Sequence, residues 1–170
     1  MKTVILKWNP AFSSYSMMHY LEDMYRLRKE DNFDYNWSVW DWREIHEGDR
    51  FFMVKVGMYG QTGIVSSGTI TSEPDKGEDW SGKGRETYYV DFLPDVLLNP
   101  DALPILTCSE LEQAIPDFEW VRGHSGLVLT DAQAQKLEEV WSAFLSKNKS
   151  LFDNALDKNY QEDLIYMSEY

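Results

Sequence analysis

Cysteine and histidine are scarce in this 170-residue chain, and basic residues are outnumbered by acidic ones. The single cysteine, Cys108, excludes an internal disulfide and a zinc site built from several thiolates. The three histidines, His19, His46 and His124, stand far apart, so we expect no metal site. Only 16 Lys and Arg oppose 29 Asp and Glu, which gives a net charge of −13. We therefore expect no clustered basic surface of the kind that binds duplex nucleic acid.

Long apolar runs are also lacking. No stretch approaches the roughly 20 apolar residues that cross a membrane, and the first apolar run, Val4–Leu6, is too short for a signal peptide. We therefore expect a cytoplasmic protein with no membrane partner.

Catalytic motifs are the third absence. The sequence has no nucleophile elbow, phosphate-binding loop, dinucleotide fingerprint or zinc-protease motif. A lone cysteine such as Cys108 is more often an inert buried thiol than a nucleophile. We therefore expect a protein that is not an enzyme, with no catalytic residue and no cofactor.

The hydrophobic pattern predicts a mixed α and β domain. Helical spacing indicates helices over residues 14–30 and 131–144, the second opened by a capping box at Thr130–Gln133, with a short helix near 109–112. Strand-like segments are expected at residues 4–6, 37–42, 51–57, 64–72, 86–93 and 126–129.

Several of these strands follow one another through hairpin-length loops. We therefore predict an α+β fold with a strongly curved, mostly antiparallel sheet of five or more strands and helices packed against it. Residues 73–85 are expected to form a loop. Residues 1–146 are expected to form one domain, and residues 147–170 a C-terminal extension that is helical near Leu151–Leu156 and then frayed.

Aromatic side chains are abundant, at 15% of the residues with seven tryptophans. Trp8 ends the first predicted strand directly before Asn9, and Trp37, Trp40 and Trp42 lie close together in sequence. Aromatic walls with a few polar groups are how proteins hold a flat heterocycle. In a strand, Trp40 and Trp42 would share one face. We predict that Trp8 and at least one of the other three face a common cavity, the alternative being that all four are core residues.

Two short segments resemble the centre of the EVE domains of the PUA-like superfamily. The first is a Gly-Asp turn followed by an apolar strand, at Gly48–Met53, and the second begins Gly-Ile-Val with small residues after it, at Gly63–Ile70. The first strand ending at Trp8–Pro10, a tryptophan before the Gly-Asp turn, and the segment Trp120–Leu129 are also similar. The resemblance runs in order from Met1 to Trp141.

This resemblance implies a PUA-like curved β-barrel with flanking α-helices. It also implies a pocket that recognises a modified nucleobase, in nucleic acid or as a small heterocyclic ligand. The ligand-binding residues that it indicates are Trp8, Asn9, Trp37, Trp40, Trp42, Ser66, Ser67 and Ser125.

The acidity leaves an alternative open, which is a protein–protein interaction domain of the adaptor or immunity type that binds no nucleic acid. Charge around the tryptophans distinguishes the two: a basic rim favours nucleic acid, whereas an acidic rim favours a small ligand or a basic partner.

Overall fold

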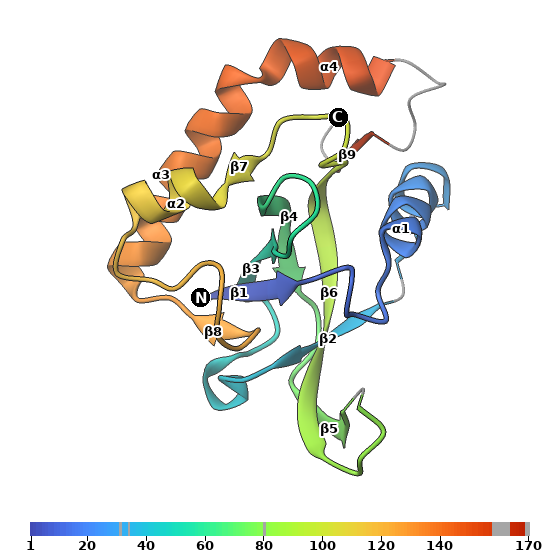
Figure 1. Ribbon diagram of the computed structural model, residues 1–170, viewed down its shortest axis with the longest axis vertical. Coiled ribbons are helices and arrows are strands. Elements are labelled where there is room, and N and C mark those ends of the chain that lie inside the picture. The colour runs from blue at the N-terminus through green and yellow to red at the C-terminus, as the bar shows by residue number, and fades with distance from the viewer. Residues whose placement is uncertain (31, 34, 80, 158–163, 169–170) are drawn as a thin grey trace.

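The computed structural model describes residues 1–30, 32–33, 35–79, 81–157 and 164–168. Within these residues, nine strands form one strongly curved sheet, whose main path runs β2-β6-β4-β3-β1-β8 (Figure 1). The strands of this path are β1 (Thr3–Trp8), β2 (Asn36–Val39), β3 (Arg50–Lys55), β4 (Gly63–Ile70), β6 (Glu86–Leu98) and β8 (Leu127–Val128). Three shorter strands join its members: β5 (Asp75–Glu78) and β9 (Ile165–Met167) pair with β6, and β7 (Leu106–Thr107) pairs with β4.

The described helices lie on both sides of this sheet. They are α1 (Met17–Glu30), α2 (Cys108–Ala114), α3 (Asp131–Lys147) and α4 (Lys149–Asp157), with one 3-10 turn, η1 (Trp42–Glu44). In Figure 1, α1 stands on one side of the long strand β6 and α2 and α3 lie on the other, while α4 runs across the top of the molecule, beyond the end of β6. None of the described helices combines the length and apolar composition needed to cross a bilayer.

The predicted α+β class and the mostly antiparallel curved sheet are confirmed. Among the described strands, β1 and β3 form a parallel pair, and the other pairs are antiparallel. The capping box predicted for the 131–144 helix is present, because Thr130 accepts from the backbone N–H of Gln133 and Gln133 accepts from that of Thr130.

Three sequence predictions are corrected by the structure. The first helix begins at Met17 and not near residue 14, since the Ser16 hydroxyl accepts the backbone N–H of His19 at the helix start. The 73–85 segment, predicted as a loop, contains β5, which pairs with β6. The C-terminal extension contains β9, which pairs with β6 at Leu98↔Ile165, although a frayed end was expected there. The parts of that expectation at 158–163 and 169–170 lie outside the described residues.

A single buried tyrosine ties α1 to the sheet. The Tyr20 hydroxyl lies within hydrogen-bond distance of the carbonyls of Val65 in β4 (2.9 Å) and Leu98 in β6 (2.7 Å), and it accepts the Leu98 N–H. Its side chain is completely buried. Because the backbone groups of these strands are themselves buried, this hydroxyl satisfies polar atoms that water does not reach.

The Arg50 guanidinium connects β3 to two further elements. It donates to Asp95 in β6 (2.7 Å) and to Glu138 in α3 (2.9 Å), and it lies over the Phe52 ring. Asp95 in turn accepts the hydroxyl proton of Ser67 at 2.5 Å. This network fixes α3 against the sheet on the side away from α1.

We expect Tyr20→Phe to lower the free energy of unfolding by about 1–3 kcal/mol, because it leaves buried backbone groups without a partner. Tyr25→Phe, on the exposed side of the same helix, is the matched control and is expected to change stability by less than about 0.5 kcal/mol. Urea denaturation of the three proteins measures both values. An equal effect of the two substitutions would contradict the role given to the Tyr20 hydroxyl.

Candidate functional site

A surface cavity of about 270 Å³ lies where the end of β1, the start of β2 and the first part of β6 meet. Its lining is aromatic and polar: Lys7, Asn9, Phe12, Ser13, Ser14, Tyr35, Asn36, Trp37, Ser38, Tyr89 and Ser125. We refer to it as the aromatic cavity. An apolar cavity of roughly 150 Å³ already accepts a benzene molecule, so a heterocycle of one or two rings fits this volume.

Strand pairing places the aromatic walls. Tyr35 precedes β2, Trp37 lies within it, and Ser38 pairs across to Tyr89 in β6. The Tyr89 hydroxyl donates to the carbonyl of Glu78 in β5 at 2.6 Å, which fixes its ring. Two neighbouring strands and a paired hairpin therefore hold the walls, so the cavity is built on regular structure.

A loop from residue 119 to residue 126, here called the closing loop, forms another wall. Lys7 in β1 is buried, and its ammonium donates to the carbonyls of Glu119 (2.6 Å) and Arg122. Trp120 anchors the loop in the core, because its indole N–H donates to the carbonyl of Ile115 at 3.0 Å. Burial lowers the pKa of Lys7, and the charge of Glu119 opposes this shift.

The closing loop then runs against β2. The backbone N–H groups of Trp40 and Asp41 donate to the carbonyls of Ser125 and Gly126, each at 3.0 Å. Gly126 has φ +84°, and a Cβ atom there would lie 2.3 Å from the Cα atom of Val39. Only glycine allows this approach, which brings Ser125 to the cavity beside Trp37.

Three residues of the predicted site share this cavity: Asn9, Trp37 and Ser125. The Trp37 indole N–H donates to Ser125 Oγ (3.1 Å) and to the carbonyl of Lys7 (3.2 Å). The arrangement gives Trp37 a fixed orientation at the cavity wall.

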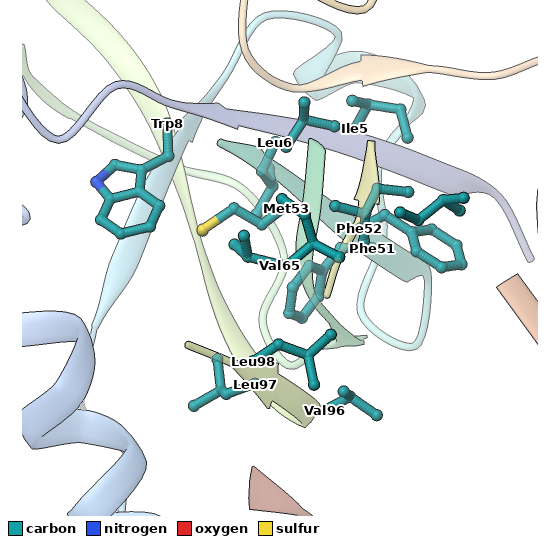
Figure 2. Close-up of a cluster of buried hydrophobic side chains, with 14 of the residues drawn as sticks. Ile5, Leu6, Trp8, Phe51, Phe52, Met53, Val65, Val96, Leu97 and Leu98 are labelled. Carbon is teal, nitrogen blue, oxygen red and sulfur yellow. The ribbon is translucent and has the colours of Figure 1, made fainter. Parts of the chain in front are cut away.

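Trp8 does not face the cavity, and the expectation that it does is corrected. Its side chain is 1% exposed, stacks on Tyr20 with ring centroids 5.0 Å apart, and donates its indole N–H to the carbonyl of Tyr15. Figure 2 shows Trp8 among the buried side chains of β1 and its neighbours. The packing of α1 and of the turn before it covers this ring, so Trp8 is a core residue.

Ser66 and Ser67 are also core residues and not pocket residues. They lie in β4, which has β3 on one side and β6 on the other, and both are completely buried. Ser67 donates to Asp95, and Ser66 Oγ has no hydrogen-bond partner among the described residues. Neither lines the aromatic cavity.

Trp40 and Trp42 do not share a strand face, because β2 ends at Val39 and Trp42 opens the 3-10 turn η1. Trp40 is 59% exposed and stacks on His124 with ring centroids 3.6 Å apart. Trp42 stacks on Tyr88 at 3.8 Å and carries the Arg43 guanidinium over its ring at 4.3 Å. Both tryptophans line a second cleft of about 500 Å³, separate from the aromatic cavity.

The two hollows differ in charge. Among the described residues that line the aromatic cavity there is no Asp or Glu, and Lys7 is its one charged group. The second cleft is lined by Asp41, Glu44 and Glu86 as well as Arg43. In a chain with 29 acidic residues, the absence of carboxylates among the described lining residues is a local property of the cavity. Elsewhere in the described part of the chain, no group of three or more His, Cys, Asp or Glu could hold a metal ion.

None of the remaining lining residues was predicted from the sequence. The sequence position of Lys7 could have indicated its role, because a lysine inside the apolar run of residues 4–8 needs a buried partner. No local sequence pattern places Tyr35 and Tyr89 at the cavity, because they reach it through the pairing of β2 with β6. Such long-range register is not visible in local periodicity.

No family model matches the chain, and no curated protein matches it. Among solved structures, the crystal structure of the Mmi1 YTH domain in complex with RNA is similar to this chain. It aligns at 7% identity over 86% of this chain and 81% of that chain, with a TM-score of 0.48. The resemblance of the sequence to EVE domains stays a prediction.

A buried acid–phenol pair supports the cavity from behind. The Tyr15 ring packs on Tyr35 (4.3 Å between centroids) and edge-on against Trp37 (5.5 Å), and its hydroxyl donates to Asp23 at 2.5 Å. Burial raises the pKa of Asp23, partly offset by this hydrogen bond. Burial also raises the pKa of Tyr15, which keeps the phenol protonated as the donor.

We expect Asp23→Asn to gain stability relative to the wild-type protein as the pH rises from 4 to 7. The native protein holds the Asp23 proton to higher pH than the unfolded chain does, whose carboxyl has a pKa near 3.8. The stabilisation from this proton is complete below that pKa and is lost as the pH rises through the native pKa. The difference amounts to about 1.4 kcal/mol for each unit of pKa elevation. Urea denaturation at both pH values measures it, with Glu30→Gln, an exposed carboxylate at the end of α1, as control. An unchanged difference would contradict the assignment.

Proposed function

We propose that this chain is a non-catalytic binding module whose aromatic cavity recognises a modified nucleobase, either unpaired in nucleic acid or as a small heterocyclic ligand. The observation that carries the proposal is an aromatic and polar cavity whose described lining residues include no carboxylate, within a protein of net charge −13. Tyr35, Trp37 and Tyr89 supply aromatic surface, and Asn9 and Ser125 supply polar contacts. The EVE-type resemblance of the sequence supports the same function.

The size of the site favours a single base. A cavity of about 270 Å³ is below the usual lower limit of roughly 300 Å³ for drug-sized ligands, so it suits one heterocycle and not a dinucleotide. A base within a duplex reaches such a cavity only after leaving the stack, which costs a few kcal/mol. The net negative charge also weakens binding to duplex phosphates. We therefore propose unpaired nucleic acid or a free ligand as the partner.

The ligand test is a titration of the intrinsic tryptophan fluorescence with modified and unmodified nucleosides and with short single strands that carry them. We expect binding by the wild-type protein and a loss of between about 5- and 150-fold for Tyr35→Ala, since stacking contributes about 1–3 kcal/mol per base. Trp40→Ala, which removes an aromatic ring outside the cavity, should bind as the wild type does. Circular dichroism of each variant verifies its fold. Absence of binding to every probe, or loss of binding in Trp40→Ala alone, would refute the proposal.

A second candidate function is an interaction with a cationic protein segment at the second cleft. The observation in its favour is the exposed ring of Trp40 beside Asp41, Glu44 and Glu86, since aromatic faces and carboxylates together attract ammonium and guanidinium groups. The adaptor-type alternative for this acidic chain requires such a surface.

A fluorescent arginine-rich peptide is the probe for this second function, measured by anisotropy at low and physiological salt. The double substitution Trp40→Ala and Glu44→Gln is expected to weaken binding of the peptide by tenfold or more. Tyr35→Ala should leave the binding affinity for the peptide unchanged. Equal binding by all three proteins would show general attraction to an acidic surface and would rule the second function out.

A further inference from the structure

Phe12 differs from the other aromatic residues of the cavity lining in its exposure to solvent. It is 79% exposed, whereas Trp37 is buried and Tyr35 and Tyr89 are half-buried. A residue that lines a cavity and is also open to solvent lies at the rim of that cavity. Phe12 therefore presents an aromatic surface beside the aromatic cavity and outside it.

The backbone that carries Phe12 is held in a tight turn. Pro10 opens this turn with a restricted φ. The backbone N–H groups of Phe12 (3.1 Å) and Ser13 (2.9 Å) both donate to the carbonyl of Asn9. The Asn9 side chain accepts the backbone N–H of Ala11 at 3.1 Å, which closes the same turn. Three hydrogen bonds to one residue make this turn a fixed support and not a hinge, so a ligand that packs on Phe12 meets a preorganised ring.

The charge at this rim is compatible with a nucleic-acid strand. Ser13 and Ser14, which follow Phe12 in the lining, have uncharged side chains, and the described lining residues include no carboxylate. A phosphate group at the rim therefore meets no like charge from these residues, although the whole protein carries a net charge of −13.

The cavity and the exposed ring together accommodate two flat groups, one inside and one outside. The cavity volume of about 270 Å³ suits one heterocycle, so a second base has its place outside. In a single strand, the neighbouring base is a flat group joined to the bound nucleotide through one phosphodiester. Every base has a π-face that stacks on an aromatic side chain. A free nucleoside has no second base and leaves the Phe12 ring uncovered.

We infer that Phe12 is a stacking platform for the base next to the one bound in the aromatic cavity, which makes the ligand of this site a single-stranded polynucleotide and not a free nucleoside. This inference rests on the proposed function and chooses between its two classes of ligand. Because Phe12 is the one exposed aromatic residue among the described lining residues, the platform serves one flank of the bound base and not both.

Trinucleotides of equal charge test the inference directly. Each carries 5-methylcytosine, 5-hydroxymethylcytosine or N6-methyladenine at its centre, as DNA and as RNA, and is compared by calorimetry with a trinucleotide whose two flanking nucleotides are abasic. Wherever binding is measurable, we expect the flanking bases to tighten it by about 5- to 150-fold, the contribution of one stacked base. Removing the base on one flank alone should abolish this gain, and removing the other should preserve it. Equal affinities with and without flanking bases would overturn the inference while leaving the proposed function intact.

Phe12→Ala assigns the gain to this ring. In this variant we expect trinucleotides with and without flanking bases to bind within about twofold of each other, at the affinity that the wild-type protein has for the abasic form. Phe12→Tyr retains an aromatic face and should keep the wild-type ratio. Tyr59→Ala is the matched control, because Tyr59 is 77% exposed and does not line the cavity. Both side chains are exposed, so their removal should leave the fold intact.

Two results with Phe12→Ala would overturn the inference. An unchanged ratio would show that the neighbouring base does not stack on Phe12. An equal loss of affinity for both trinucleotides would make Phe12 part of the site for the first base. Failure of the wild-type protein to bind any of the trinucleotides or nucleosides would refute the proposed function itself, and so is distinguishable from the absence of a flanking-base effect.

Discussion

The buried ammonium group of Lys7 is the contact on which the aromatic cavity depends. It stands in a strand whose six residues are all buried, and it donates to two carbonyls of the closing loop. Taking a lysine out of water is costly unless its protons find partners, so the loop and the strand hold each other in place. The position of Ser125, its bonds to Trp37 and the pairing of the loop with the end of β2 all follow from that attachment.

Charge is distributed unevenly around the aromatic side chains. Among the described residues, Lys7 is the one charged residue that lines the aromatic cavity beside Trp37, whereas Trp40 and Trp42 line a cleft with three carboxylates and one arginine. The net charge of the protein therefore says little about which ligand an individual cavity attracts. The electrostatic field and the hydrogen bonds that a ligand meets come from residues within a few ångströms. The acidity of the whole molecule bears on duplex phosphates and solubility, while the cavity chemistry is set by its own lining.

Much of the fold could be predicted from local patterns. The apolar strands β1, β3 and β4 and the helices α1 and α3 follow from periodicity, and the α3 start follows from its capping box. Strand β5 could not be predicted, because its residues Asp75–Glu78 carry charge and glycine and are held by pairing with β6. The edge strand β9 likewise depends on a partner far away in sequence.

The site was harder to predict than the fold, because contacts between residues distant in sequence decide where the tryptophans lie. Trp8 is buried because Tyr15, in the turn after the strand, and Tyr20, in the helix that follows, pack against its ring. The positions of Trp40 and Trp42 depend on where β2 ends, which is at Val39. Beyond Val39, the backbone N–H groups of Trp40 and Asp41 bond to the closing loop and no longer to β6. In each case the deciding contact is tertiary.

The placement of β1 in the sheet has a consequence for how the molecule assembles. Its parallel partner β3 lies about 50 residues later in the chain and its antiparallel partner β8 about 120 residues later, and such distant pairings close slowly. During synthesis, the apolar segment Thr3–Trp8 emerges before both of the strands that pair with it. Until the closing loop arrives, its backbone is an open edge available to other chains. The cavity, which needs β1 and the loop together, is therefore among the last parts of the molecule to form.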